Sequence, residues 1–300
     1  GRSPPPGASH AHAAAAGAHA GGALAGAGRA DDDLERIKDG LDGADRETDL
    51  FTFLNSIGIG DDHELNQRSL AQAAAFPVAF GTAHLALTRY ARVTPGQTVL
   101  VLGAAGGVGL AAVQVAKALG AVVVAVANGA GKMGALEDAG ADHRIDASTL
   151  HSKGGARKDD YAGLKATVGK ISPGGVDVMF DPVGGDGFSN GLRCLKWGGV
   201  ALVIGFASGD VPRLAMNVPL VKNLSVRGVY WGSHAARAPE ELAESLKEVY
   251  SMLAAGRCVV RVSHAFGLDD AHEGFRTIAE RRAVGKVVVT PAGKRAASRL

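Results

Sequence analysis

The segment Thr98–Leu102 is apolar and rich in valine and leucine, without the alternation of a half-exposed strand. Continuous apolarity is typical of a parallel strand that is covered on both faces. Four of the next seven residues are glycines, and the helix that follows is apolar except at Gln114 and Lys117. A second apolar run, Ala121–Ala127, comes after it. This order predicts two parallel strands joined by a right-handed helical crossover.

The same alternation of apolar strands and helices continues to the end of the chain. Further strands are expected within Asp142–Asp146 and at Gly175–Asp181, Gly199–Gly205, Leu224–Val229, Val259–Ser263 and Lys286–Thr290. Helices are expected at Leu70–Arg89, broken at Pro77, and at Lys132–Ala139, Phe188–Trp197, Pro239–Ala255 and Asp269–Glu280. Regular alternation predicts an α/β fold with a doubly wound, Rossmann-like parallel sheet.

The chain divides by composition into three parts. Residues 1–69 begin with a low-complexity stretch rich in Ala, Gly and Pro, which is too poor in large apolar residues to build a core. We therefore expect a disordered and weakly structured N-terminal segment. Residues 70–292 carry the strand and helix pattern and form the expected dinucleotide-binding domain with its C-terminal return strands, and residues 293–300 are a tail.

Charge and cysteine content exclude several classes of function. The formal net charge is +2, from 32 basic and 30 acidic residues, which gives no electrostatic case for a nucleic-acid or anionic-membrane partner. No apolar run approaches the ~20 residues that a spanning helix needs. Cys194 and Cys258 are too few for a structural zinc site and fit a reducing compartment. No metal is expected.

The glycine turn predicts a phosphate-binding site. A side chain at Gly106 would keep backbone N–H groups away from a diphosphate, and Gly109 lets the helix pack closely against the strand. The helix N-terminus adds unpaired N–H donors and a partial positive charge. Ala104 stands where the usual G-x-G-x-x-G pattern has its first glycine, but the strand–turn–helix context is the expected one. The alternative is a tight turn that binds nothing.

The end of the second strand favours NADPH over NADH. An NAD site carries an acidic residue about 20 residues after the turn, which holds the ribose 2′-hydroxyl. Here the strand ends in Ala127-Asn128 without a carboxylate, and Lys132 follows closely. A lysine–phosphate hydrogen bond stabilises by about 1.5–3 kcal/mol, which is enough to set the preference. The alternative for Lys132 is a solvated residue at a helix start.

From about Ala71 to Ala292 the chain resembles the zinc-independent quinone oxidoreductases of the medium-chain dehydrogenase/reductase superfamily. The resemblance is carried, in the family's order, by AAAFPVAFGTAHLAL, VTPGQTVLVLGAAGGVGLAAVQVAKALGA, GVDVMFDPVGGD, GGVALVIGFASG, NLSVRGVYWG and GKVVVTP. It implies an NADPH-dependent enzyme that passes a hydride to a quinone or an enone. It also implies a homodimer through the sheet edge near Leu224–Val229.

The resemblance also assigns residues to the cofactor. It places Gly106, Gly107 and Val108 at the diphosphate, Lys132 at the 2′-phosphate, and Thr82, Val183, Phe206 and Ser208 near the nicotinamide. The full set of candidate cofactor-binding residues is Thr82, Ala105, Gly106, Gly107, Val108, Asn128, Lys132, Val183, Phe206 and Ser208. No catalytic proton donor is assigned.

The sequence departs from the family in two places. Ala147 stands where the family often has a tyrosine that supports the phosphate. The family also has an N-terminal GroES-like barrel that forms the other wall of the active cleft, and residues 1–69 contain none of its motifs. The alternative function is therefore a non-catalytic, NADPH-binding relic that lacks the substrate domain.

A different class, serine hydrolase, is suggested by Gly187-Phe188-Ser189-Asn190-Gly191, which fits G-x-S-x-G. That motif needs its serine on a sharp turn directly after a strand. The strand expected to end at Asp181 is separated from Ser189 by a glycine-rich turn. We therefore rank this function below nucleotide-dependent redox chemistry.

The last three residues, Ser298-Arg299-Leu300, resemble the S-K-L peroxisomal address. The expected location is peroxisomal or cytoplasmic, because three-residue matches also arise by chance.

Overall fold

The computed structural model describes residues 70–150 and 161–290. The expected N-terminal segment, residues 1–69, lies outside the described residues, as does the tripeptide Ser298-Arg299-Leu300. The predictions made for these two parts of the chain stay predictions.

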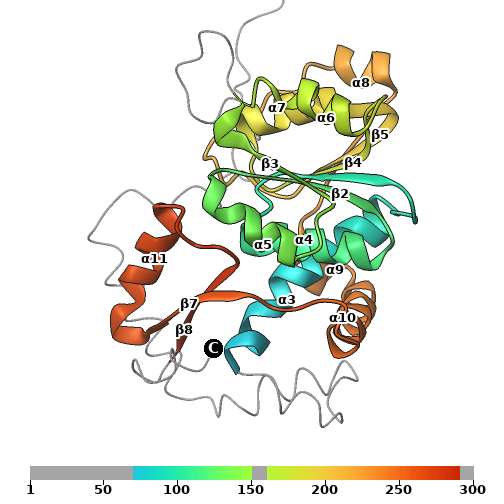
Figure 1. Ribbon diagram of the computed structural model, residues 1–300. Coiled ribbons are helices and arrows are strands. Elements are labelled where there is room, and N and C mark those ends of the chain that lie inside the picture. The colour runs from blue at the N-terminus through green and yellow to red at the C-terminus, as the bar shows by residue number, and fades with distance from the viewer. Residues whose placement is uncertain (1–69, 151–160, 291–300) are drawn as a thin grey trace, which may run out of the picture. The chain divides into compact units, whose positions relative to one another are not determined.

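A six-stranded parallel sheet forms the centre of the fold (Figure 1), and its strand order is β3-β2-β1-β4-β5-β6. The strands are β1 Thr98–Val101, β2 Val122–Ala127, β3 His143–Asp146, β4 Val176–Asp181, β5 Leu195–Val203 and β6 Ser225–Gly228. Adjacent strands pair in parallel throughout. The doubly wound parallel sheet predicted from the sequence is confirmed. The order reverses between β1 and β4, and such switch points create crevices in open α/β sheets.

Helices cover both faces of the sheet, which explains the continuous apolarity of its strands. They are α3 Leu70–Leu85, α4 Gly107–Ala118, α5 Met133–Asp138, α6 Leu164–Ile171, α7 Gly185–Cys194, α8 Asn217–Lys222, α9 His234–Arg237, α10 Pro239–Ala254 and α11 Ala271–Ala279. The short turns are η2 Ala86–Tyr90, η3 Ala130–Lys132, η4 Ala147–Thr149, η5 Trp231–Ser233 and η6 Leu268–Asp270.

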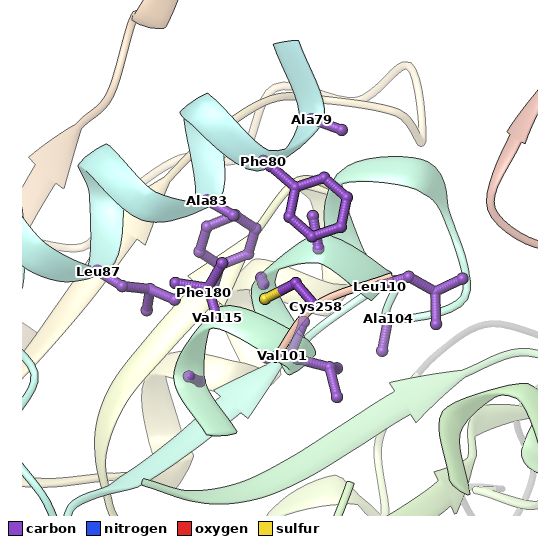
Figure 2. Packing of buried hydrophobic residues seen from close by; sticks show 14 of the residues in the cluster. Ala79, Phe80, Ala83, Leu87, Val101, Ala104, Leu110, Val115, Phe180 and Cys258 are labelled. Carbon is purple, nitrogen blue, oxygen red and sulfur yellow. The ribbon is translucent and has the colours of Figure 1, made fainter. Parts of the chain in front are cut away.

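Two apolar clusters lie on opposite faces of the sheet. Val99 and Val101 of β1 join the cluster that contains α3 and α4, whereas Leu100 joins the cluster that contains α6 and α7. Successive side chains of a strand point to opposite faces, so both sets are buried. Figure 2 shows residues of the first cluster, among them Phe80 of α3, Leu110 of α4 and Phe180 of β4. Burial on this scale supplies the main driving force for folding.

The prediction of a break at Pro77 is wrong, because α3 runs through this residue without interruption. A proline inside a helix removes one backbone hydrogen bond and costs about 3 kcal/mol. Here the helix buries Ala75, Phe76, Ala79 and Phe80 around the proline. Apolar burial contributes about 1.5–3 kcal/mol for each large side chain, which offsets the lost hydrogen bond.

The boundaries predicted for α7 and β5 are displaced. The helix spans Gly185–Cys194 rather than Phe188–Trp197, and β5 begins at Leu195. Lys222 explains where the helix ends, because its ammonium donates to the terminal carbonyls of Leu192 and Arg193, at 3.5 and 3.2 Å. A cation at a helix C-terminus satisfies carbonyls that have no partner within the helix.

The two late strands pair with each other in parallel, as β7 Val262–Gly267 and β8 Lys286–Thr290, with α11 between them in sequence. The predicted strand at Val259–Ser263 is therefore three residues too early. Gln114 of α4 is the reason, since its side chain accepts from the Val259 N–H at 2.6 Å and donates to the Val259 carbonyl at 3.1 Å. Those backbone groups are not available to a neighbouring strand.

Candidate cofactor-binding site

A cavity of about 860 Å³ opens at the carboxyl ends of the strands, beside the switch point between β1 and β4. Most of the candidate cofactor-binding residues line it: Ala105, Gly106, Gly107, Val108, Asn128, Lys132, Val183 and Ser208. These residues follow β1, β2, β4 and β5 in turn, because the carboxyl ends of parallel strands meet at one edge.

The glycine turn leaves the N-terminus of α4 open. Gly106 is the N-cap residue, and no side chain caps the first turn of the helix. A methyl group at Gly106 would meet only the Gly103 carbonyl, at 3.4 Å, so the space beside it is free for a ligand. The turn is held to the sheet by the Ala104 N–H, which donates to the Val126 carbonyl at 2.9 Å. Unsatisfied N–H groups at such a terminus suit an anion.

A second basic residue lies beside Lys132. Lys132 ends the turn η3, and Arg281, from the loop after α11, lines the same cavity. Partial burial lowers the pKa of Lys132, and the positive charge of Arg281 lowers it further. Two cations held close together favour an anion between them. Sequence reasoning missed Arg281, because nothing in the local pattern around it connects this residue with β2.

The wall opposite Lys132 is built from two turns that hold each other in place. Ser208 N–H donates to the Val183 carbonyl at 2.9 Å, and Gly185 N–H donates to the Asp210 carbonyl at 3.0 Å. The buried Asp181 carboxylate accepts from the N–H groups of Val183 and Gly184, at 2.7 and 3.1 Å. Burial raises the pKa of Asp181 to about 6, against the opposing effect of these hydrogen bonds.

Two candidate residues do not line the cavity. Thr82 is buried within α3, and Phe206 packs its ring against Gly184 instead of entering the cavity. Several lining residues were not predicted, namely Tyr161, Asp186, Asp210, Arg281, Gly285 and Lys286. The only sequence signal for the last two is a glycine immediately before an apolar strand. The assignments of individual residues to the cofactor stay predictions.

Ser189 does not occupy a nucleophile elbow. It lies within α7, and its hydroxyl donates to the Gly185 carbonyl one turn earlier, at 3.4 Å. A hydrolase of the G-x-S-x-G type needs the serine on the turn between strand and helix. The structure therefore offers no support for the hydrolase alternative.

Residues 70–150 and 161–290 contain no group of three or more His, Cys, Asp or Glu side chains that could hold a metal ion. None of the helices in this part of the chain combines the length and the apolarity that crossing a bilayer requires.

Comparison with known proteins identifies relatives of this chain. A family model described as zinc-binding dehydrogenase matches residues 107–267, more than half of the 300 residues. The quinone oxidoreductase-like protein 2 homolog of Nematostella vectensis is 36% identical over 223 residues, which cover 74% of this chain and 58% of that protein. Quinone oxidoreductase-like protein 2 of Bos taurus is also 36% identical, and the match covers 74% of this chain and 61% of that protein. The chain thus spans about three fifths of the length of these curated relatives.

Solved structures agree with these relatives. Escherichia coli quinone oxidoreductase complexed with NADPH matches with a TM-score of 0.65 and 29% identity, over 75% of this chain and 67% of that chain. The sequence motifs, the strand order and these matches lead to one conclusion. The chain belongs to the zinc-binding dehydrogenase family, as a zinc-independent, quinone oxidoreductase-like member of the medium-chain dehydrogenase/reductase superfamily.

Proposed function

We propose that this protein is an NADPH-dependent oxidoreductase that transfers a hydride to a quinone or an α,β-unsaturated carbonyl compound. The observation that supports it most is that one cavity contains both an open helix N-terminus and the basic pair Lys132 and Arg281. NADPH and NADH share a diphosphate, and NADPH carries an additional 2′-phosphate. The open helix N-terminus suits the diphosphate, and the basic pair suits the 2′-phosphate.

The residues present fit this cofactor. The open space at Gly106 admits a diphosphate to the N–H groups of α4, where a side chain would obstruct it. Asn128, directly after β2, lies where the adenosine ribose is held in dinucleotide-binding folds. Lys132 and Arg281 line the same cavity and supply the positive charge that a phosphate on that ribose requires. A cavity of about 860 Å³ is within the range of cofactor sites.

The wall formed by Val183 and Ser208 supports the nicotinamide side of the cavity. When bound, NADPH supplies the hydride, and the protein contributes binding, orientation and electrostatics. Val183 and Ser208 form a rigid part of the cavity wall. Their two turns are joined by a hydrogen bond, and Asp181 accepts a further hydrogen bond from the Val183 N–H. Rigid placement of the reacting groups is the part of catalysis that these residues provide.

The test is a titration of the purified 300-residue protein with NADPH and with NADH, followed by addition of 9,10-phenanthrenequinone or an alkenal. Tighter binding of NADPH and oxidation of NADPH on addition of an acceptor are the expected results. Binding without oxidation of NADPH would favour the alternative, a protein that holds the nucleotide but does not turn it over. Absence of binding for both nucleotides would contradict the proposal.

The protein is further proposed to be a homodimer that pairs through the outer edge of β6. This strand is the last of the sheet, so its outer backbone groups have no neighbouring strand in the described chain. Exposed apolar side chains flank it, with Leu220 and Val221 before the strand and Tyr230 after it. A second copy related by a two-fold axis would cover both features at once.

A further inference from the structure

Two aspartates flank β3 and hold the two ends of β2. Asp142, directly before β3, accepts from the Val123 N–H near the start of β2, at 2.7 Å. Asp146, the last residue of β3, accepts from the Gly129 N–H beyond the end of β2, at 2.8 Å. The ladder between the two strands ends at the pair Ala127 and Asp146, so Gly129 lies outside it. The Asp146 carboxylate therefore fixes the chain at the point where β2 leaves the sheet.

The bend at Gly129 leads directly to Lys132. Gly129 has a φ of +107°, a conformation that residues with a side chain rarely adopt. A methyl group built there would meet no atom within 4 Å, so the backbone conformation, and not a lack of space, requires glycine. The Lys132 N–H donates to the Gly129 carbonyl at 3.1 Å. Two consecutive hydrogen bonds thus connect the Asp146 carboxylate with the backbone of Lys132.

The carboxylate that holds this bend is itself fixed and ionised. Its Oδ1 atom also accepts from the N–H and the hydroxyl of Ser148, at 2.9 and 2.7 Å. Partial burial raises the pKa of Asp146, but the hydrogen bonds from Ser148 and Gly129 outweigh burial and bring the pKa below its ordinary value. Among the described residues, those that line the cavity include Asn128 and Lys132 but not Asp146. An effect of Asp146 on a ligand must therefore pass through the backbone that it holds.

We propose that Asp146 is a positioning residue that sets the preference for NADPH over NADH, because it holds the turn that carries Lys132. The proposal rests on the proposed function, in which Lys132 and Arg281 hold the 2′-phosphate. A lysine side chain loses conformational freedom when it binds, so its contact with a phosphate is strongest when the backbone that carries it is already in place. Release of the bend would leave the Lys132 charge in the cavity without a fixed approach to the phosphate.

The charge of Asp146 makes this role testable, because two explanations predict changes of opposite sign. If the carboxylate acted only as a charge, it would repel the 2′-phosphate, and its removal would tighten NADPH binding. As a positioning residue, its removal weakens NADPH binding. Asp146→Ala should lower the affinity for NADPH by about threefold to thirtyfold, which is part of the roughly tenfold to hundredfold from the complete Lys132 contact. The affinity for NADH should change by less than about twofold.

Asp146→Asn is the conservative variant that should retain the preference. The hydrogen bonds from Gly129 and Ser148 are all accepted by Oδ1, and an amide oxygen can accept them in the same place. Gly129→Ala loosens the same bend from the other side, because alanine does not adopt a φ of +107° readily. It should lower the ratio of the NADPH and NADH affinities in the same direction as Asp146→Ala.

The experiment is isothermal titration of the purified 300-residue protein and its variants with NADPH and with NADH. Asp142→Ala is the matched control, because it removes a hydrogen bond of the same kind from the other end of β2, together with the ion pair to Lys117. It should destabilise the fold and leave the ratio of the two affinities unchanged. Thermal unfolding shows whether each variant is folded, and Gly129→Ala decides the question if Asp146→Ala is not.

Three results would overturn the assignment and leave the proposed function intact. The first is an affinity ratio within twofold of the unmodified protein in folded Asp146→Ala or, failing that, in Gly129→Ala. The second is a raised ratio in Asp146→Ala, which would show that the carboxylate only repels the phosphate. The third is an equal fall of the ratio in Asp142→Ala, which would show a general effect of loosening the sheet. Failure of the unmodified protein to bind either nucleotide would instead contradict the proposed function.

Discussion

A methyl group on Gly109 would lie 2.3 Å from the Gly103 carbonyl oxygen, because α4 approaches the end of β1 at that point. The same methyl group would lie 2.7 Å from Cα of Ala104. Both neighbours are backbone atoms of the turn, so neither can rotate away. The close packing of helix against strand that the sequence predicts at Gly109 is therefore part of the fold and does not depend on a bound ligand.

Gly109→Ala and Gly106→Ala should separate packing from binding. Gly109→Ala forces the helix away from the strand and should destabilise the protein by about 1–3 kcal/mol or more, as overpacking does. Gly106→Ala places its methyl group in open space at a φ of −75° that alanine adopts readily, and should cost less than about 1 kcal/mol. It should nevertheless weaken NADPH by more than about tenfold, since the methyl group occupies the diphosphate site.

Urea denaturation and NADPH titration of both variants check this pair of expectations. Full-strength nucleotide binding by Gly106→Ala would show that the turn does not hold the diphosphate. Normal stability of Gly109→Ala would show that the close approach of α4 is not required.

Lys132→Ala should remove the preference for NADPH. Loss of one phosphate contact corresponds to about 1.5–3 kcal/mol, or roughly a tenfold to hundredfold weaker affinity for NADPH, with NADH unchanged. Arg281→Ala should act in the same direction, because both side chains line the same end of the cavity. Dissociation constants of NADPH and NADH, measured for the unmodified protein and for both variants, test this expectation. Equal affinity for both nucleotides in the unmodified protein would refute the 2′-phosphate site.

Asp181 should make the stability of the fold depend on pH. Burial raises its pKa from 3.8 to about 6, so the folded state takes up this proton at higher pH than the unfolded state. The group therefore stabilises the fold below about pH 4, and this contribution is lost as the pH rises through about 6. Asp181→Asn removes the charge and keeps an oxygen that accepts from Val183.

The expected result is that Asp181→Asn gains stability relative to the unmodified protein between about pH 4 and pH 8, by up to about 3 kcal/mol. Urea denaturation at the two pH values measures this difference. Asp186→Asn, at the exposed start of α7, is the control and should show no such change. An identical pH dependence in Asp181→Asn and the unmodified protein would rule out Asp181 as the source.

Leu220→Glu and Tyr230→Glu should dissociate the proposed homodimer. Leu220 is 80% exposed and Tyr230 76% exposed in the single chain, so neither substitution disturbs the core. A charge at an apolar interface resists burial and should shift the protein towards the monomer. Sedimentation velocity of the unmodified and substituted proteins measures the species present. A monomer at every concentration of the unmodified protein would exclude this dimer.

Two differences between the predicted and the observed helix and strand boundaries show where a local sequence pattern does not determine the structure. Pro77 predicts a break by its own chemistry, but the apolar residues around it are buried in a helix that packs on α4 and α10, and the helix continues. Val259 lies in an apolar run typical of a strand, but the side chain of Gln114 occupies its backbone groups. In both cases a residue from a distant part of the chain determines the local conformation, and propensity is overridden.

The sequence by itself determined the β1–turn–α4–β2 unit, because every residue that forms this unit lies within one continuous segment. It also determined the parallel sheet, since buried strands and helices alternate along the chain. Only the tertiary structure decided that Arg281, Gly285 and Lys286 belong to the same site. Their position depends on the Gly285 N–H reaching the Ala105 carbonyl and on β8 pairing with β7. Contacts of this kind arise from packing between distant segments, and no spacing in the sequence encodes them.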